Sequence, residues 1–152
     1  MFRRILVPVD GSRTSNQGLK EAVQLARDQG ARLRMIHVVD EYVITQNVEG
    51  FVNAGDLIDA LRDAGKKAIA AALAFARKHR VKADSALYES MGGRVADVIV
   101  REARKWKADL IVMGTHGRRG VGRVVLGSDA EAVLHETPAP VLLVRAPGKR
   151  RR

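Results

Sequence analysis

A chain of 152 residues that is 46% hydrophobic can form the core of one domain, and its lack of cysteine excludes disulfides and thiol chemistry. No apolar run reaches the length of a membrane span and no signal-peptide pattern follows Met1, so we expect a cytoplasmic protein without membrane contact. The net charge of +10 attracts polyanions without specificity, but aromatic residues make up only 4% of the chain and offer little for stacking on bases, so no specific nucleic-acid partner is expected.

The hydrophobic pattern alternates between apolar runs typical of buried strands and segments with helical spacing. Ile5–Val9 is the first apolar run, and Ser12 is positioned to cap a helix that ends at Gly30. Residues 40–55 fit neither pattern, and we interpret them as a long excursion over the face of the protein where a ligand would bind. We expect strands at residues 5–9, 33–39, 81–89, 109–113 and 141–144, and helices at residues 13–29, 56–79, 94–105 and 128–136.

Strict alternation of strands and helices predicts an α/β fold, a doubly wound open parallel sheet of five strands with helices on both faces. The third strand is the least apolar and is expected at an edge of the sheet. Ligands of such sheets bind beyond the carboxyl ends of the strands, where the winding reverses. If the first and fourth strands are neighbours there, the loop Pro8–Ser12 meets the segment that follows Met113. We expect one domain at residues 1–146 and a basic tail at residues 147–152.

The segment from Met113 to Ser128 combines a strand, a glycine-rich loop and the start of a helix. A glycine backbone can approach a ligand closely, and N–H groups in such loops and at helix N-termini favour phosphate. The glycine spacing matches neither the P-loop nor the Rossmann fingerprint. The alternative is a surface loop whose glycines only make turns. Four basic side chains make the loop positive: His116, Arg118, Arg119 and Arg123.

These segments together resemble the universal stress protein family over nearly the whole chain. The resemblance is carried by Ile5–Ser12, Ile36–Val39, Asp109–Gly114, the glycines that end in Gly127 and Ser128, and Thr137–Val144. Within that family, this glycine spacing marks members that bind ATP. The resemblance therefore implies a strand order of 3-2-1-4-5, an ATP site, and a homodimer built through the last strand, Val141–Val144.

The resemblance also implies a set of nucleotide-binding residues. The ribose and adenine end is assigned to Pro8, Val9 and Asp10, to main-chain groups of Val38 or Val39, and to Met113. The ribose and first phosphates are assigned to Gly114, His116 and Gly117, and the terminal phosphates to Gly127 and Ser128. Asp129 is included as a further nucleotide-binding residue. A bound Mg²⁺ or Mn²⁺ ion is compatible with this site, and no catalytic residue or metal ligand is assigned.

Several of these residues also have a purely structural interpretation. Asp10 is also suited to capping the first helix, and Ser128 to capping the fourth helix. The capping role of Ser128 is compatible with phosphate binding, because both use the same free N–H groups. His116 is equally typical of a surface histidine.

Three functions are consistent with the sequence. The first is a regulatory module that binds ATP between the loops after the first and fourth strands. The second is a slow ATPase, or an enzyme that transfers phosphoryl or adenylyl groups, although no convincing general base stands beside the predicted phosphates. The third is a basic protein that associates with nucleic acid, for which no recognised binding signature is present.

Overall fold

The structure is a computed structural model that describes residues 1–41, 53–90, 92–116 and 126–147. Most of the predicted excursion and most of the basic tail lie outside these ranges. The strands are β1 (Arg4–Pro8), β2 (Arg32–Val39), β3 (Ala83–Glu89), β4 (Leu110–Gly114) and β5 (Val141–Val144), and the helices are α1 (Arg13–Gln29), α3 (Ala54–Lys78), α4 (Val95–Trp106) and α5 (Ser128–Glu136).

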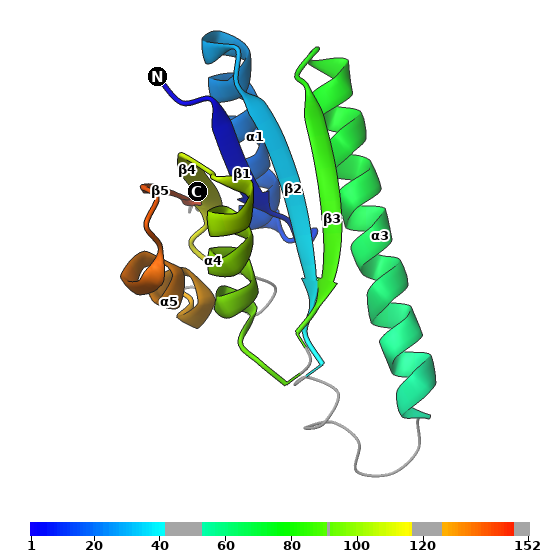
Figure 1. Ribbon diagram of the computed structural model, residues 1–152. Coiled ribbons are helices and arrows are strands. Elements are labelled where there is room, and N and C mark those ends of the chain that lie inside the picture. Colours follow the sequence, from blue (N-terminus) through cyan, green and yellow to red (C-terminus); the bar gives the residue numbers. More distant parts are fainter. Residues whose placement is uncertain (42–52, 91, 117–125, 148–152) are drawn as a thin grey trace, which may run out of the picture.

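The five strands form one parallel sheet in the order β3-β2-β1-β4-β5, which confirms the predicted fold class and strand order (Figure 1). β3 lies at an edge, as its more polar sequence predicts. The winding reverses at β1, because the chain first adds β2 and β3 on one side and then β4 and β5 on the other. The carboxyl ends of β1 and β4 are therefore neighbours.

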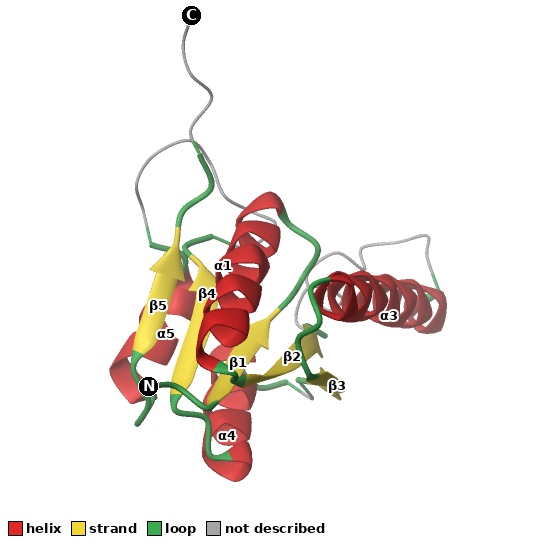
Figure 2. Cartoon of the chain, turned by 90° about the horizontal axis from the view of Figure 1, so that it is seen from above, coloured by secondary structure: helices red, strands yellow, loops and turns green. Residues whose placement is uncertain are grey.

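Helices cover both faces of the sheet, because successive strand residues point in opposite directions. Ile5 and Val7 of β1 point into a core formed with α1 and α3. Leu6, between them, points into a second core formed with α4 and α5. Figure 2 shows α1 and α4 on opposite sides of the sheet. Burial on both faces explains why the central strands are continuous apolar runs.

The ends of α1 confirm the predicted helix signals. The Oγ of Ser12 accepts a hydrogen bond from the N–H of Ser15 at 3.2 Å, which satisfies a donor in the first helical turn. Gly30 ends the helix in the left-handed conformation, with a φ of 66°. These two residues fix the crossover that carries the chain from β1 to β2.

Other element boundaries differ from the predictions by one or two residues. α3 begins at Ala54 rather than Asp56, because the side-chain oxygen of Asn53 caps the helix by accepting from the N–H of Gly55 at 3.1 Å. Val9 lies one residue beyond β1, although its N–H still donates to the carbonyl of Ile36 at 2.8 Å. Across the ranges that the structure describes, no helix has the length and apolar character needed to cross a membrane.

Glu102 of α4 is a carboxylate buried against the sheet, with 2% of its surface exposed. It accepts from a guanidinium N–H of Arg34 at 2.9 Å and from the hydroxyl of Tyr88 at 2.5 Å. Arg34 also donates to Asp84 at 2.6 Å, and its guanidinium lies 5.0 Å from the centroid of the Trp106 ring. Loss of hydration, followed by the hydrogen bond to Glu102, raises the pKa of Tyr88 to about 12. This cluster joins α4 to β2 and β3.

We predict that Glu102→Gln lowers the free energy of unfolding by about 1–3 kcal/mol, because Arg34 loses a buried counter-charge and the Tyr88 hydroxyl loses its carboxylate acceptor. Urea denaturation monitored by circular dichroism measures this change. Glu21→Gln, at an exposed carboxylate on α1, is the matched control and should change stability by less than about 0.5 kcal/mol. Equal effects of the two substitutions would contradict a stabilising role for the cluster.

Candidate functional site

The N-terminus of α1 packs directly against the end of β4. A Cβ on Gly114 would lie 2.8 Å from the carbonyl carbon of Thr14, so only glycine allows this approach. On the helix side, a Cβ on Gly18 would lie 3.4 Å from the main-chain nitrogen of Gly114, an ordinary contact distance. The hydroxyl of Thr14 also donates to the carbonyl of His116. These contacts bring the loop after β1 together with the segment after β4. We refer to the carboxyl ends of β1, β2 and β4, with the first turns of α1 and α5, as the carboxyl edge.

Asp10 turns the chain from β1 into α1. Its carboxylate accepts from the N–H of Ser12 at 2.8 Å, and its own N–H donates to the Oγ of Ser15 at 3.1 Å. The residue is half-buried. Ser12 rather than Asp10 caps α1, so the predicted capping role of Asp10 is wrong. The hydrogen bonds of Asp10 form a turn before the helix instead, and they hold its carboxylate at the carboxyl edge.

Thr115 and His116 carry the chain out of β4. The carbonyl of Thr115 accepts from the N–H of Gly127 at 2.8 Å, which joins the two ends of the glycine-rich loop. The Nδ1 of His116 lies 3.0 Å from the hydroxyl oxygen of Thr115. Its Nε2 is buried and has no hydrogen-bond partner among the residues that the structure describes. The remainder of the loop lies outside the described residues, including Gly117, Arg118, Arg119 and Arg123.

Gly127 is the N-cap of α5 and no side chain caps this end, so the predicted capping role of Ser128 is wrong. Ser128 and Asp129 begin the first helical turn and are exposed. The pKa of Asp129 is raised above its ordinary value, first by loss of hydration and then by the negative charges of Asp40 and Asp10, while Arg94 acts in the opposite direction. Two loop carboxylates, Asp10 and Asp40, and Asp129 of α5 thus create a local negative potential. Within the described ranges, no three His, Cys, Asp or Glu side chains are grouped closely enough to hold a metal ion.

The main chain at the end of β2 presents different groups to its two neighbours. The carbonyl of Ile36 accepts from Val9, so the main-chain groups of Ile36 face β1. The carbonyl of Val39 accepts from the N–H of Ser90 at 3.0 Å, so the main-chain groups of Val39 face the β3 side. Because this direction alternates along a strand, the N–H and C=O of Val38 face the β1 side, beyond Pro8. Of the two predicted alternatives, Val38 rather than Val39 faces the carboxyl edge.

His37 of β2 contacts the loop that follows β1, and Gly65 of α3 packs against His37. Neither residue is among the predicted nucleotide-binding residues. His37 is buried, with 8% of its surface exposed, and its Nδ1 lies 2.7 Å from the carbonyl oxygen of Val9. A Cβ on Gly65 would lie 2.3 Å from the Cδ2 of His37. The sequence signals for this pair are a histidine within an apolar strand and a glycine inside an alanine-rich helix.

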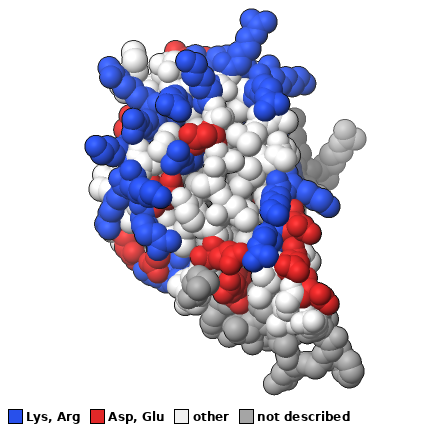
Figure 3. All heavy atoms as spheres, turned by 45° about the vertical axis from the view of Figure 1, so that its right-hand side comes forward, with Lys and Arg blue, Asp and Glu red and all other residues white. Residues whose placement is uncertain are grey.

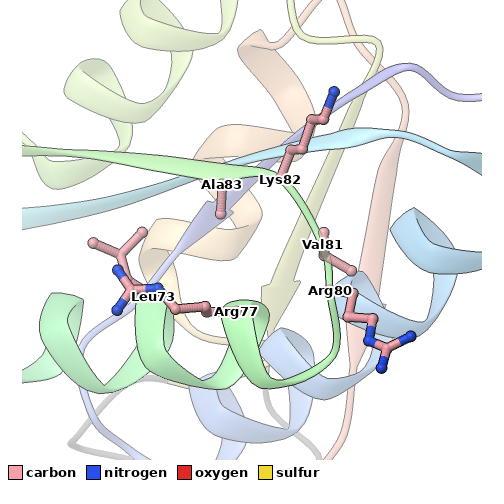
Figure 4. Close-up of a pocket in the computed structure, with 6 residues that line it drawn as sticks. All are labelled: Leu73, Arg77, Arg80, Val81, Lys82 and Ala83. Atoms are coloured by element: carbon pink, nitrogen blue, oxygen red, sulfur yellow. The ribbon is translucent and has the colours of Figure 1, made fainter.

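A shallow hollow occupies the opposite end of the sheet, away from the predicted site (Figure 4). In Figure 4, Arg80 and Lys82 extend in different directions rather than toward one point. Figure 3 shows Lys and Arg gathered at the end of the molecule where α3 finishes, and Asp and Glu nearer the other end. The hollow therefore belongs to a basic end of the molecule, distinct from the carboxyl edge. Its lining residues are Leu73, Arg77, Arg80, Val81, Lys82 and Ala83.

The positions of the predicted site residues fall into three groups. Met113 is largely buried in the core formed with α4 and α5, and Gly117 lies outside the described residues. The remaining predicted residues lie at the ends of strands or at the start of α5 along the carboxyl edge: Pro8, Val9, Asp10, Val38, Val39, Gly114, His116, Gly127, Ser128 and Asp129.

The sequence of the chain matches a known family. The sequence profile of the universal stress protein family matches residues 1–145. The chain belongs to the universal stress protein family. One curated member, universal stress protein MJ0531 of Methanocaldococcus jannaschii, is 36% identical over 151 residues, which cover 98% of this chain and 85% of that protein.

Solved structures of universal stress proteins share this fold. UspA from Lactobacillus plantarum superposes with a TM-score of 0.79 at 26% identity and covers 95% of this chain and 98% of that one. A universal stress protein from Archaeoglobus fulgidus in complex with dAMP superposes with a TM-score of 0.65 at 24% identity, covering 94% of this chain and 98% of that one. At this lower identity the likeness concerns the fold alone.

We predict that Gly114→Ala lowers the free energy of unfolding by about 1–3 kcal/mol, because the new methyl group would overlap the main chain of Thr14. Gly18→Ala is the matched control from the other side of the same contact. It should leave stability unchanged or raise it slightly, because alanine is the better helix former and its methyl group has room. Thermal or urea unfolding measures both. If Gly114→Ala proved as stable as Gly18→Ala, the close approach of α1 to β4 would be wrong.

Proposed function

We propose that this universal stress protein binds an adenine nucleotide, ATP above all, at the carboxyl edge between the segments that follow β1 and β4. The observation that carries the proposal is the packing of the α1 N-terminus on β4, which gathers the ends of three strands and the start of α5 along one edge. Open α/β sheets bind ligands where their winding reverses, which here is beside β1. The Archaeoglobus fulgidus universal stress protein, which shares the fold, was solved with dAMP.

At the base end, we assign the adenine edge to the main chain of Val38. One N–H donor beside one C=O acceptor suits adenine, whose N1 accepts and whose N6 amino group donates, whereas guanine presents a donor at N1 and an acceptor at O6. Pro8 and Val9 supply the neighbouring surface. The carboxylate of Asp10, oriented by Ser12, is the acceptor for a ribose hydroxyl.

At the phosphate end, we assign the terminal phosphates to the first turn of α5, where Ser128 has an exposed hydroxyl and the helix N-terminus offers main-chain N–H groups. The N–H of Gly127 donates to the carbonyl of Thr115 within the fold, so we leave it out of the proposed phosphate contacts. His116, flanked by Gly114 and Gly117, brings a buried Nε2 that a ribose or phosphate oxygen would satisfy.

A divalent cation fits this proposal if it arrives with the nucleotide. Magnesium is typically held by one or two carboxylates together with substrate phosphates and water, rather than by a cage made entirely of protein. The negative potential shared by Asp10, Asp40 and Asp129 disfavours a bare triphosphate. We therefore assign Asp129, beside the terminal phosphates, as the side chain that would hold Mg²⁺ or Mn²⁺, which would screen the phosphate charge.

We propose a regulatory binding module rather than an efficient enzyme. Phosphoryl transfer requires a positioned nucleophile or base, and the acidic residues of the first α5 turn, Asp129 and Glu131, are exposed to solvent. Nucleotide occupancy would act by shifting a conformational equilibrium, to the extent that its affinity for the two forms differs. Slow hydrolysis remains an alternative, and association with nucleic acid would engage the basic end instead.

We also propose that the protein forms a homodimer through β5. This strand lies at the edge of the sheet, where unpaired main-chain groups favour association with another strand. Leu142 of β5 is 38% exposed and Leu134 of α5 is 42% exposed. An edge strand flanked by exposed leucines suits a second copy of the same chain.

Ser128→Ala should weaken ATP binding roughly tenfold and AMP binding less than about twofold, because the hydroxyl is assigned to the terminal phosphates. Isothermal titration calorimetry with each nucleotide and Mg²⁺ measures this difference. Ser85→Ala, at an exposed serine of β3, is the matched control and should change neither affinity. Equal losses for ATP and AMP, or no loss, would remove Ser128 from the phosphate end.

Leu142→Asp should convert the dimer to a monomer, because a charged side chain in a paired edge disfavours association. Sedimentation velocity measures the oligomeric state. Ala74→Asp, at an exposed alanine of α3, adds the same charge elsewhere and should leave the dimer intact. A Leu142→Asp protein that sedimented as a dimer would place the interface on another surface.

A further inference from the structure

The carbonyl group of Val9 is hydrogen-bonded in an unusual way for the end of a parallel strand. Pro8 pairs with Ile36 in the sheet register, so Val9 lies opposite His37. The N–H of Val9 makes the regular ladder bond to the carbonyl of Ile36 at 2.8 Å. In a continued ladder, the carbonyl of Val9 would accept from the N–H of Val38. Instead, the Nδ1 of His37 lies 2.7 Å from this oxygen.

The side chain of His37 thus takes the place of a main-chain donor. A carbonyl oxygen only accepts, so the Nδ1 must carry the proton of this bond. Val9 and His37 are 4% and 8% exposed, so the carbonyl requires a protein donor and the ring provides it. The β1–β2 ladder accordingly stops at Val9, and the main-chain groups of Val38 continue to face the carboxyl edge.

Gly65 of α3 makes room for this ring. A Cβ at Gly65 would lie 2.3 Å from the Cδ2 and 2.8 Å from the Nε2 of His37. A glycine in a helix interior is destabilising relative to alanine, so its presence in the alanine-rich α3 has a packing cause. Helix α3 therefore packs against the ring of His37, and the ring in turn contacts Val9 in the loop after β1.

We propose that His37 is a positioning residue of the nucleotide site. Its ring donates to the carbonyl of Val9 in the place where the N–H of Val38 would otherwise donate, and it thereby keeps that N–H, beside the C=O of Val38, available to read an adenine edge. Gly65 supports this role by fixing the ring against Val9. The inference rests on the proposed nucleotide site for its functional part, whereas its hydrogen-bonding part concerns the protein alone.

Substitution of His37 tests the functional part. His37→Leu leaves the carbonyl of Val9 to bond the N–H of Val38, so affinity for ATP should fall roughly tenfold and the preference for ATP over GTP should narrow. His37→Asn places an amide N–H near the position of Nδ1 and should retain the wild-type preference. Calorimetry with ATP and GTP measures both quantities. Equal weakening of the two nucleotides by His37→Leu, or failure of Asn to restore the preference, would overturn the inference.

Nuclear magnetic resonance tests the hydrogen-bonding part without any nucleotide. The ¹⁵N shifts of labelled His37 should show a protonated Nδ1, and the amide of Val38 should exchange with solvent faster than that of Val9. His37→Leu should protect the Val38 amide from exchange. If the wild-type protein binds neither ATP nor GTP, the proposed function is wrong, but these spectra still test whether His37 replaces the N–H of Val38 as the donor to Val9. An unprotonated Nδ1, or a Val38 amide protected in the wild type, would overturn it.

Gly65→Ala provides an independent check on the same contact. In the protein with the wild-type His37, the added methyl group should displace the ring and reduce the preference for ATP over GTP. In a His37→Asn background the smaller side chain leaves space, so the same Gly65→Ala change should have less effect. If Gly65→Ala changed the ATP preference by the same factor in the wild-type and His37→Asn proteins, Gly65 would not act through His37.

Discussion

The reversal of winding at β1 is the constraint on which the rest of the molecule depends. β1 lies between β2 and β4, so the loop after β1 and the segment after β4 emerge side by side, and α1 must pack against both. The glycine at position 114 permits that packing, and the capped start of α1 fixes where the loop turns. This packing fixes the course of the main chain at the carboxyl edge, and the proposed site draws largely on those backbone groups.

Two glycines of the predicted phosphate motif have roles in the fold itself. Gly114 is required by the close approach of Thr14, and the N–H of Gly127 closes the base of the loop by bonding Thr115. These contacts belong to the fold and would exist without a ligand. The features that suit a nucleotide are different ones: an exposed serine at a helix N-terminus, a histidine nitrogen lacking a described partner, and a strand end whose main chain faces the edge.

Much of the fold could be predicted because local signals agreed with the tertiary structure. Apolar runs such as Ile5–Val7, the cap at Ser12 and the stop at Gly30 depend on neighbouring residues, and the resemblance to universal stress proteins supplied the strand order. The contact of His37 with Val9 and Gly65, and the burial of Glu102 against Arg34, could not be predicted in this way. Each joins residues far apart in the sequence, and neither histidine nor glutamate in an apolar pattern specifies its partner.

The most direct test of the account is an amide chemical-shift titration of the wild-type protein with ATP and Mg²⁺. Binding at the carboxyl edge predicts that the amides of Val38, His116 and Ser128 shift at the same nucleotide concentration, while those of Arg77 and Lys82 at the basic end stay unchanged. Shifts confined to Arg77 and Lys82 would instead show nonspecific attraction of phosphate to the basic end. That result, or a spectrum unchanged at millimolar ATP, would contradict the proposed site.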